Sequence, residues 1–176
     1  MVKMSNCEIC KKIEQKAAKV VYEDDKVFAC LTAKPASLGH ILVMPKEHFS
    51  IIEMVPDPLF EHLFKVVNKI SIAVFEALHA QGTNIIIQNG VAAGQDVPHF
   101  LVHIIPRMQN DNLSFKWAPK QLNEEEMSTV EMMLKDQTST IGMREEKKKP
   151  VEVEQKEDET ISGEDNYLLK QLKRLP

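Results

Sequence analysis

The segment GQDVPHFLVHIIPR, from Gly94 to Arg107, carries the pattern that decides the fold. Its part from Val97 to Ile105 is predicted to form a β-strand, in which successive side chains point to opposite faces. Two histidines on one strand face indicate either a functional site or a pair of partly buried, hydrogen-bonded side chains. The expected faces are Phe100, Val102 and Ile104 toward the core and His99, Leu101 and His103 on the other side.

Further strands and helices are predicted on both sides of this segment. The long helix is expected to begin at Asp57-Pro58, since Pro is favoured in the first turn, and its apolar residues recur with helical spacing to Leu78. Asn123 and Glu126 form a capping-box pattern for a later helix. The other predicted strands are Val20–Tyr22, Lys26–Leu31, His40–Pro45 and Asn84–Gln88. This order predicts an α+β fold with an antiparallel sheet of about five strands, a long helix and a C-terminal extension.

Three parts of the chain differ in composition. Residues 1–142 are predicted to form the folded domain. Residues 143–164 are rich in Lys, Glu and Asp and cannot bury enough apolar surface to offset the entropy of ordering, which predicts a flexible linker. Residues 165–176 place four leucines on one face of a short helix. This helix is expected to pack on its own domain or to recruit an external partner.

The overall composition excludes several functional classes. The 176-residue chain has a formal net charge of −4, so no general nucleic-acid-binding surface is indicated. No apolar run reaches the length of a membrane span, and residues 1–6 do not resemble a signal peptide. Three cysteines form a poor disulfide framework. We therefore expect a cytoplasmic protein without a membrane partner.

Cys7 and Cys10 have the spacing of a metal-ligand pair. Two thiolates separated by two residues can bind one tetrahedral Zn²⁺ from a single turn, although two ordinary cysteines in a helix would show the same spacing. His48 follows the third predicted strand and His99 opens the last, so these two are candidates for the remaining ligands. Four protein ligands would make the zinc structural, since no coordination position stays open for water. His62 and His79, on the long helix, are expected to be solvated.

Several separated motifs resemble the histidine-triad (HIT) superfamily over about residues 5–109. These motifs are CEIC, GHILVMPKEH, NG followed after three residues by GQDVPH, and HIIPR, in that order. The resemblance implies an antiparallel α+β fold, frequent homodimers and a bound nucleoside monophosphate moiety, here expected from a purine nucleotide. Because some branches of the superfamily bind zinc through two Cys and two His, it also favours zinc at Cys7, Cys10, His48 and His99.

Leu101 departs from the family's motif, in which three histidines alternate with apolar residues. The middle histidine of the family attacks the α-phosphorus, and Leu101 occupies that position. A leucine side chain has neither a lone pair nor a titratable proton, so the family's nucleotidyl-histidine route cannot run through it. His103 matches the third histidine, which contacts the phosphate in the family.

The resemblance also assigns polar residues to the nucleotide pocket. Asn89 and Gln95 match residues that hold the phosphate and leaving group, and the backbone near Val97 matches a phosphate-approaching segment. Thr32 matches an acidic residue that accepts hydrogen bonds from both ribose hydroxyls. Thr lacks the two-oxygen fork of a carboxylate, which predicts a loss of about 1.5–3 kcal/mol in ligand affinity.

Three functions remain open from the sequence. The first is a HIT-fold nucleotide-binding protein that is impaired in the family's chemistry. The second is an active phosphohydrolase or nucleotidyltransferase in which His103 acts as a displaced nucleophile or as a general base for water. The third is an interaction scaffold that acts through the charged tail.

Overall fold

The computed structural model describes residues 7–139 and residue 141. Its contacts divide the chain into two units, residues 1–117 and residues 118–176. The predicted linker 143–164 and the predicted helix 165–176 lie outside the described residues. The extension of the folded domain to residue 142 therefore stays a prediction.

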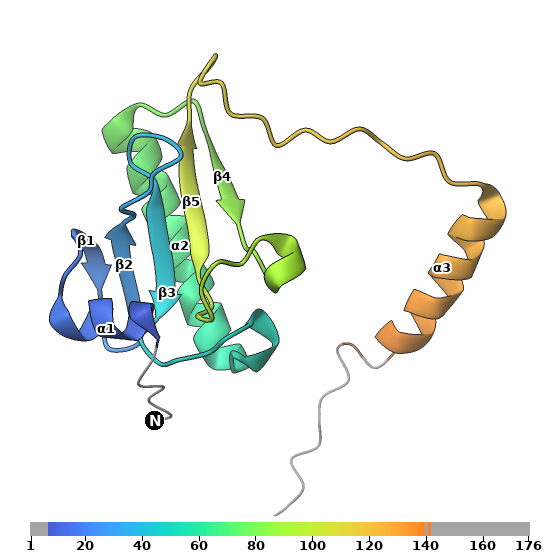
Figure 1. Cartoon of the computed structure of the whole chain (residues 1–176), viewed down its shortest axis with the longest axis horizontal. Helices are drawn as coiled ribbons and strands as arrows, with labels where there is room; N and C mark the ends of the chain where they lie inside the picture. Colours follow the sequence, from blue (N-terminus) through green and yellow to red (C-terminus); the bar gives the residue numbers. More distant parts are fainter. Residues whose placement is uncertain (1–6, 140, 142–176) are drawn as a thin grey trace, which may run out of the picture. The chain divides into compact units, whose positions relative to one another are not determined.

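The first unit is built on one antiparallel sheet of five strands in the order β1-β2-β3-β5-β4 (Figure 1). The strands are β1 (Val20–Glu23), β2 (Val27–Leu31), β3 (Ile41–Pro45), β4 (Gly82–Ile86) and β5 (Val102–Arg107). Two short 3₁₀ helices, η1 (Ile52–Met54) and η2 (Val91–Ala93), interrupt the connecting loops. The predicted α+β fold with an antiparallel five-stranded sheet is confirmed.

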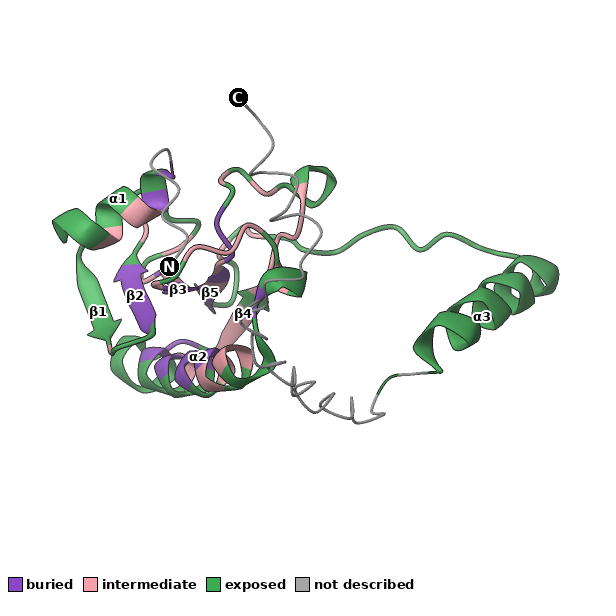
Figure 2. Ribbon diagram, turned by 90° about the horizontal axis from the view of Figure 1, so that it is seen from below, coloured by how far each residue is buried: buried purple, intermediate pink, exposed green. Residues whose placement is uncertain are grey.

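Helix α2 (Asp57–Leu78) covers one face of the sheet (Figure 2). Its buried side chains recur every three or four residues and form one stripe, as expected for a helix packed on a sheet: Leu63, Val66, Val67, Ile70 and Val74. This stripe joins Phe100, Val102 and Ile104 in the larger core cluster. The helix ends at His79, whose φ of 52° puts it in the left-handed conformation that often terminates helices.

Helix α1 (Glu8–Gln15) lies on the opposite side of the sheet from α2 (Figure 2). A second, smaller core cluster lies here, because alternate residues of β2 and β3 point away from α2. Its buried members are Cys7, Ile9, Phe28, Cys30 and Met44, and Leu42, Val97 and Leu101 pack against them. The N-terminal helix is therefore attached to the sheet through this cluster.

Strand β5 begins at Val102, five residues later than predicted, so the expected strand from Val97 is wrong in its first half. Residues 97–100 form other backbone hydrogen bonds. The His99 N–H donates to the Val97 carbonyl at 2.8 Å, and the Phe100 N–H donates to the Phe49 carbonyl at 2.6 Å. The predicted division of side chains between two faces nevertheless holds for Phe100 and Leu101, which enter different core clusters.

The second unit contains helix α3 (Glu124–Thr138). The predicted capping box is confirmed, since the Asn123 side chain accepts from the Glu126 N–H and the Glu126 side chain accepts from the Asn123 N–H. Among the described residues, no helix has the length and apolar content needed to cross a membrane.

Asp24 ties the β1–β2 turn to helix α2. Its carboxylate accepts hydrogen bonds from the backbone N–H groups of Lys26 and Val27, at 2.8 and 2.7 Å, and its other oxygen contacts Tyr22 and His62. Burial raises the pKa of this carboxyl, but these hydrogen bonds outweigh burial and hold the pKa well below its usual value. His62, which was expected to be solvated, is therefore part of this contact.

Replacing Asp24 by Ala is expected to lower the free energy of unfolding by about 2 kcal/mol, because two backbone donors lose their acceptor. Chemical denaturation of the full chain measures this change. The matched control is Asp25→Ala, at an exposed neighbouring position, which should stay within about 0.5 kcal/mol of wild type. Equal stability of the two variants would show that Asp24 does not fix this turn.

Candidate metal centre and ligand pocket

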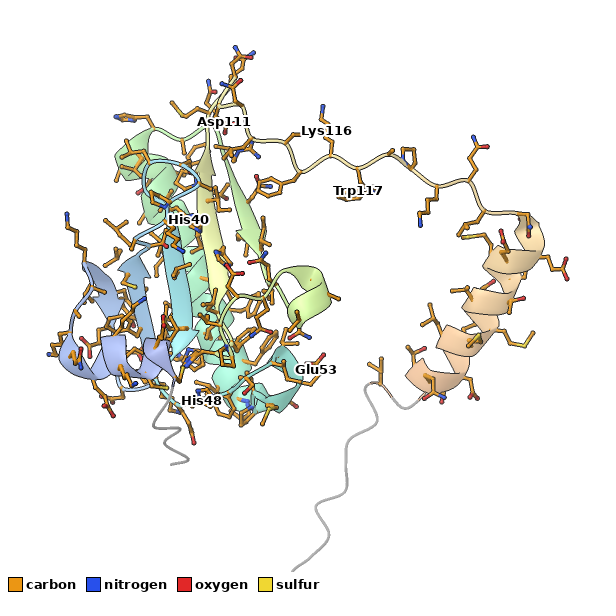
Figure 3. The ribbon with its side chains drawn as sticks, viewed as in Figure 1. His40, His48, Glu53, Asp111, Lys116 and Trp117 are labelled. Carbon is orange, nitrogen blue, oxygen red and sulfur yellow. The ribbon has the colours of Figure 1, made fainter. Side chains whose placement is uncertain are left out.

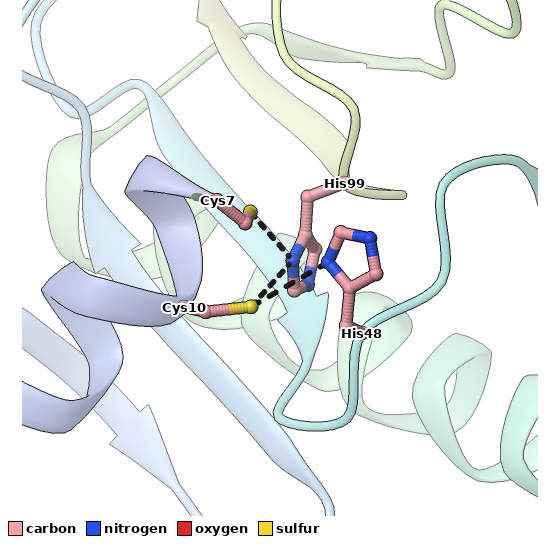
Figure 4. Close-up of side chains that lie close together, drawn as sticks. All are labelled: Cys7, Cys10, His48 and His99. Carbon is pink, nitrogen blue, oxygen red and sulfur yellow. Dashed lines mark hydrogen bonds between the residues drawn. The ribbon is translucent and has the colours of Figure 1, made fainter. Parts of the chain in front are cut away.

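Four predicted metal ligands converge from three separate segments of the chain. Cys7 and Cys10 begin helix α1, His48 follows β3 and His99 precedes β5 (Figure 4). One ligand atom from each of these residues lies within 4.8 Å of the other three. Cys7 and His99 are 3% and 0% exposed, so a bound ion would be shielded from bulk water on that side.

The spacing of these atoms fits a tetrahedral metal ion. The Nδ1 atom of His99 lies 3.6 Å from the sulfur of Cys7 and 3.6 Å from that of Cys10. The Nδ1 atom of His48 lies 3.5 Å from the Cys10 sulfur. Tetrahedral angles with Zn–S near 2.3 Å and Zn–N near 2.0–2.1 Å put sulfur and nitrogen about 3.5 Å apart. The residues present therefore fit an ion of this kind.

The second ring nitrogen of each histidine has a partner that orients the ring. The Nε2 atom of His99 donates to the Pro45 carbonyl at 3.0 Å, which leaves the Nδ1 lone pair directed toward the sulfurs. The Nε2 atom of His48 lies 3.4 Å from the Ser50 hydroxyl. Both rings thus present the nitrogen that metal coordination requires.

The electrostatics of the cluster favour a cation. Burial, followed by the hydrogen bond and the charge of Cys7, raises the pKa of the Cys10 thiol to about 11. Burial also lowers the pKa of His99 to about 4. Two thiolates at this position would consequently need a positive ion beside them, and the neutral His99 ring leaves its Nδ1 lone pair available to such an ion.

Leu101 and His103 lie on the sheet side opposite α2. Leu101 is partly buried and packs against the cluster that contains Cys7 and Phe28. His103 sits on β5, opposite Leu42 on β3 and Ile86 on β4. Leu101 thus takes part in the core beneath α1.

His40 contacts His103 and was missed as a site residue by the sequence analysis. The Nε2 atom of His40 lies 3.0 Å from the Nδ1 atom of His103, and the Ala36 N–H donates to His40 Nδ1 at 3.1 Å. Burial, and secondarily the charge of His103, lowers the pKa of His40 to about 4. The antiparallel pairing of β3 with β5 is the signal that could have found this contact.

His103 itself is half-buried and its charge is disfavoured. Burial lowers its pKa, and the carboxylate of Asp96 partly opposes this change. Figure 3 places His40 and His48 at the two ends of β3, so the histidine pair and the metal cluster are separated along this strand.

Asn89 and Gln95 hold neighbouring loops together. Asn89 accepts from the Ile52 N–H at 3.0 Å and donates to Glu53 at 2.8 Å. The Gln95 amide nitrogen donates to the carbonyls of Ser50 and Val97 at 2.7 and 2.9 Å, and its oxygen accepts from the Gly90 N–H. The structure therefore gives both amides internal partners around η1 and the loop before β5.

Thr32 and Val97 are also predicted pocket residues, and both lie within residues 1–117. The Thr32 hydroxyl accepts from the Lys34 N–H at 3.2 Å, immediately after β2. Val97 packs on the cluster that also contacts Leu101. Of the predicted nucleotide-binding residues, Gln95 and Val97 are joined directly by a hydrogen bond.

Several known proteins resemble this chain in sequence and in fold. The HIT-domain family profile matches residues 14–110. A HIT-like protein of Borreliella burgdorferi is 38% identical over 135 residues, which cover 74% of this chain and 97% of that protein. An adenylylsulfatase of Arabidopsis thaliana is 35% identical over 119 residues, 67% of this chain and 59% of its own length.

A solved structure of a histidine-triad protein also resembles this chain. A zinc-bound histidine-triad family protein of Mycobacterium smegmatis superimposes with a TM-score of 0.59 and is 34% identical, covering 77% of this chain and 97% of the other. The matched profile spans more than half of the chain and contains the β3 and β5 segments described above. This chain belongs to the HIT-domain family.

Proposed function

We propose that this chain is a cytoplasmic, zinc-containing HIT protein that binds a purine nucleotide but lacks the family's nucleotidyl-histidine chemistry. The observation that carries the proposal is Leu101, which stands where the family motif has its middle histidine and cannot attack phosphorus. Its packing against the cluster beneath α1 supports a stable structural role for the leucine.

The metal is proposed to be zinc with a structural role. Two sulfur and two nitrogen ligands at tetrahedral spacing are typical of structural Zn²⁺ sites, and a relative is zinc-bound. When bound, zinc would supply charge neutralisation for the thiolates of Cys7 and Cys10. It would thereby hold α1 against the loops that follow β3 and precede β5, and His99 would serve as a ligand instead of a catalytic group.

A nucleotide ligand is favoured by the family and by the relative named an adenylylsulfatase. His103 is the histidine of the motif that stays available to a phosphate, while Asn89, Gln95 and Val97 shape the loop before β5. Thr32 replaces the expected carboxylate at the ribose, which predicts weaker binding than in relatives with an acid there.

Catalysis by His103 is the second candidate. Two residues of extended chain span about 6.5–7 Å, so a substrate bound in the family's pose at position 101 would not reach position 103 as a nucleophile. Water attack with His103 as general base requires an unprotonated nitrogen facing the water. The single observation that favours this candidate is the location of His103 on the sheet face opposite α2, where the nucleotide is proposed to bind.

The chain is proposed to form a homodimer through α2 and the edge strand β4. Ile72 and Phe75 of α2 are 45% and 51% exposed, and Ile85 of β4 is 47% exposed. Ser71 and Thr83 hydrogen-bond at 3.0 Å, which brings these apolar residues of the two elements to one side of the sheet. Exposed apolar side chains on two adjoining elements, beside a strand that forms the sheet edge among the described residues, fit a second copy of the chain.

Isothermal titration calorimetry with AMP tests the nucleotide proposal. Binding is expected in the micromolar-to-millimolar range, and His103→Ala should weaken it about tenfold through loss of one hydrogen bond to a charged group. No heat from any purine nucleotide at millimolar concentration would contradict nucleotide binding.

Leu101→His is expected to raise hydrolysis of an adenosine phosphoramidate by about a hundredfold or more, because it restores the nucleophile. The imidazole should cost about 1–3 kcal/mol of stability, since position 101 contacts an apolar cluster. Leu101→Gln is the matched control, polar but not nucleophilic, and should gain no activity. Wild-type turnover at a rate typical of enzymes would contradict the impaired state.

The reduced full-length protein is expected to contain one zinc ion per chain by elemental analysis. Cys10→Ser should lose the ion, whereas Cys30→Ala should keep it because Cys30 lies outside the ligand cluster. Removal of the metal by a chelator should lower the free energy of unfolding by about 4 kcal/mol, as for a ligand held at about 1,000 times Kd. Protein with reduced cysteines and no stoichiometric metal would exclude the zinc site.

Phe75→Asp is expected to convert a dimer into a monomer in sedimentation equilibrium, because it places a charge in the proposed interface. The matched control is Leu38→Asp, at an 87% exposed apolar residue on a different loop, which should remain dimeric. A monomeric wild-type protein would rule out the dimer.

A further inference from the structure

A chain of hydrogen bonds runs from the backbone of Ala36 through His40 to His103. The Ala36 N–H lies 3.1 Å from His40 Nδ1, and His40 Nε2 lies 3.0 Å from His103 Nδ1. His40 is 6% exposed, so water does not compete freely for these groups. The Ala36 backbone N–H sets the direction of these hydrogen bonds, because it can only donate.

The direction of this donor fixes the protons on both rings. His40 Nδ1 accepts from Ala36 and therefore holds a lone pair, so the proton of the neutral His40 ring is on Nε2. That proton points to His103 Nδ1, which must then be the acceptor. The remaining proton of a neutral His103 ring is consequently on its Nε2 atom.

We propose that His40 is a positioning residue that holds His103 in the Nε2–H tautomer, so that His103 donates a hydrogen bond to an anionic ligand oxygen and cannot take a proton from water. The ligand part rests on the proposed nucleotide-binding function. A general base at Nε2 would need the opposite tautomer, with protons on His103 Nδ1 and His40 Nδ1. The second of these protons would oppose the Ala36 N–H, so the backbone excludes that state.

The surroundings of the pair favour the neutral rings that this tautomer requires. Burial lowers the pKa of both histidines, and in His40 the charge of His103 acts in the same direction. Asp96 is the charged group that acts on His103 in the opposite direction. A proton on His103 Nδ1 would also replace the lone pair that accepts from the His40 Nε2–H group. Burial and the hydrogen-bond geometry therefore both oppose this protonation.

The fixed tautomer distinguishes two roles considered for His103, which are phosphate binding and general-base catalysis. A protonated Nε2 is suited to a phosphate oxygen, which accepts hydrogen bonds, and unsuited to deprotonating a water molecule. His40 thus confers on the pocket a preference for ligands that present an anionic or carbonyl oxygen at this point. It also removes the water-attack route that the loss of the middle histidine would otherwise leave.

Two-bond ¹H–¹⁵N correlation spectra of the metal-loaded full chain, with ¹⁵N-labelled histidine, test the tautomer directly. The wild-type protein near pH 7 is expected to show His103 with a bare Nδ1 and a protonated Nε2, and His40 with the same pattern. Spectra of His103→Gln and His40→Gln assign the two sets of resonances. A His103 ring protonated on Nδ1, or averaged between both tautomers, would overturn the proposal.

Two substitutions at His40 separate positioning from general stability. His40→Ala removes the donor and should leave His103 averaged between tautomers, with AMP affinity reduced about threefold to tenfold. His40→Gln retains an N–H donor near the same place and should keep the wild-type His103 pattern and an affinity within about twofold. An unchanged His103 pattern in His40→Ala would overturn the proposal. If His40→Ala does not fold, the wild-type and His40→Gln spectra still decide it.

The same experiments distinguish failure of this inference from failure of the proposed function. Absence of AMP binding, with the His103 tautomer as expected, would count against nucleotide binding and leave the positioning role of His40 intact. AMP binding by a protein with the opposite His103 tautomer would support the function and overturn the inference.

Discussion

The antiparallel pairing of β3 with β5 is the constraint on which the rest of the site depends. Its register sets Ile41 against Ile104, Leu42 against His103 and Val43 against Val102. The residue before β3 is His40, which therefore reaches His103, and the loop after β3 carries His48 toward His99. One strand pair thus assembles both the histidine pair and half of the metal cluster. A slip of one residue would reverse the faces of all these side chains.

An ion bound at the Cys/His cluster would add to the small apolar cluster in holding α1, whereas apolar packing alone holds α2. Helix α2 buries a stripe of five aliphatic residues, whereas α1 has eight residues and buries Ile9 alone within its span. Such a short helix is marginal without further contacts. An ion bound at Cys7, Cys10, His48 and His99 would join α1 to the two loops that border β3 and β5. Leu101 packs against the apolar cluster that contains Cys7, so this region also has apolar contacts beneath α1.

The alternating and helical patterns of the sequence were sufficient to predict the sheet, α2 and the capping box of α3. The CxxC spacing indicated Cys7 and Cys10 as a ligand pair, and the resemblance to the HIT superfamily favoured His48 and His99 as the other two members of the Cys/His cluster. The first half of the predicted Val97–Ile105 strand was wrong, since the His99 and Phe100 N–H groups bond within the turn and to Phe49. Periodicity cannot detect a backbone that pairs with a loop distant in sequence.

Other parts of the site depend on partners that no local pattern reveals. His40 contacts His103 through the strand register, and His62, which was expected to be solvated on the long helix, contacts Asp24, a residue distant in the sequence. Asn89 and Gln95 were assigned to a ligand by resemblance, whereas the structure shows their bonds to Ile52, Glu53, Ser50, Val97 and Gly90. These amides order the loop before β5, and their contact with a ligand stays a prediction.

The most direct measurement of lost covalent chemistry is the intact mass of the full-length protein during incubation with an adenosine phosphoramidate. A nucleotidyl-histidine intermediate would add one adenylyl group to the chain, and under the proposed assignment Leu101 stands where the family motif has the residue that forms it. The wild-type chain is predicted to keep its unmodified mass under conditions in which calorimetry detects bound nucleotide. An adenylyl adduct on His103, or on any other histidine of the wild-type chain, would contradict the proposed loss of nucleotidyl transfer.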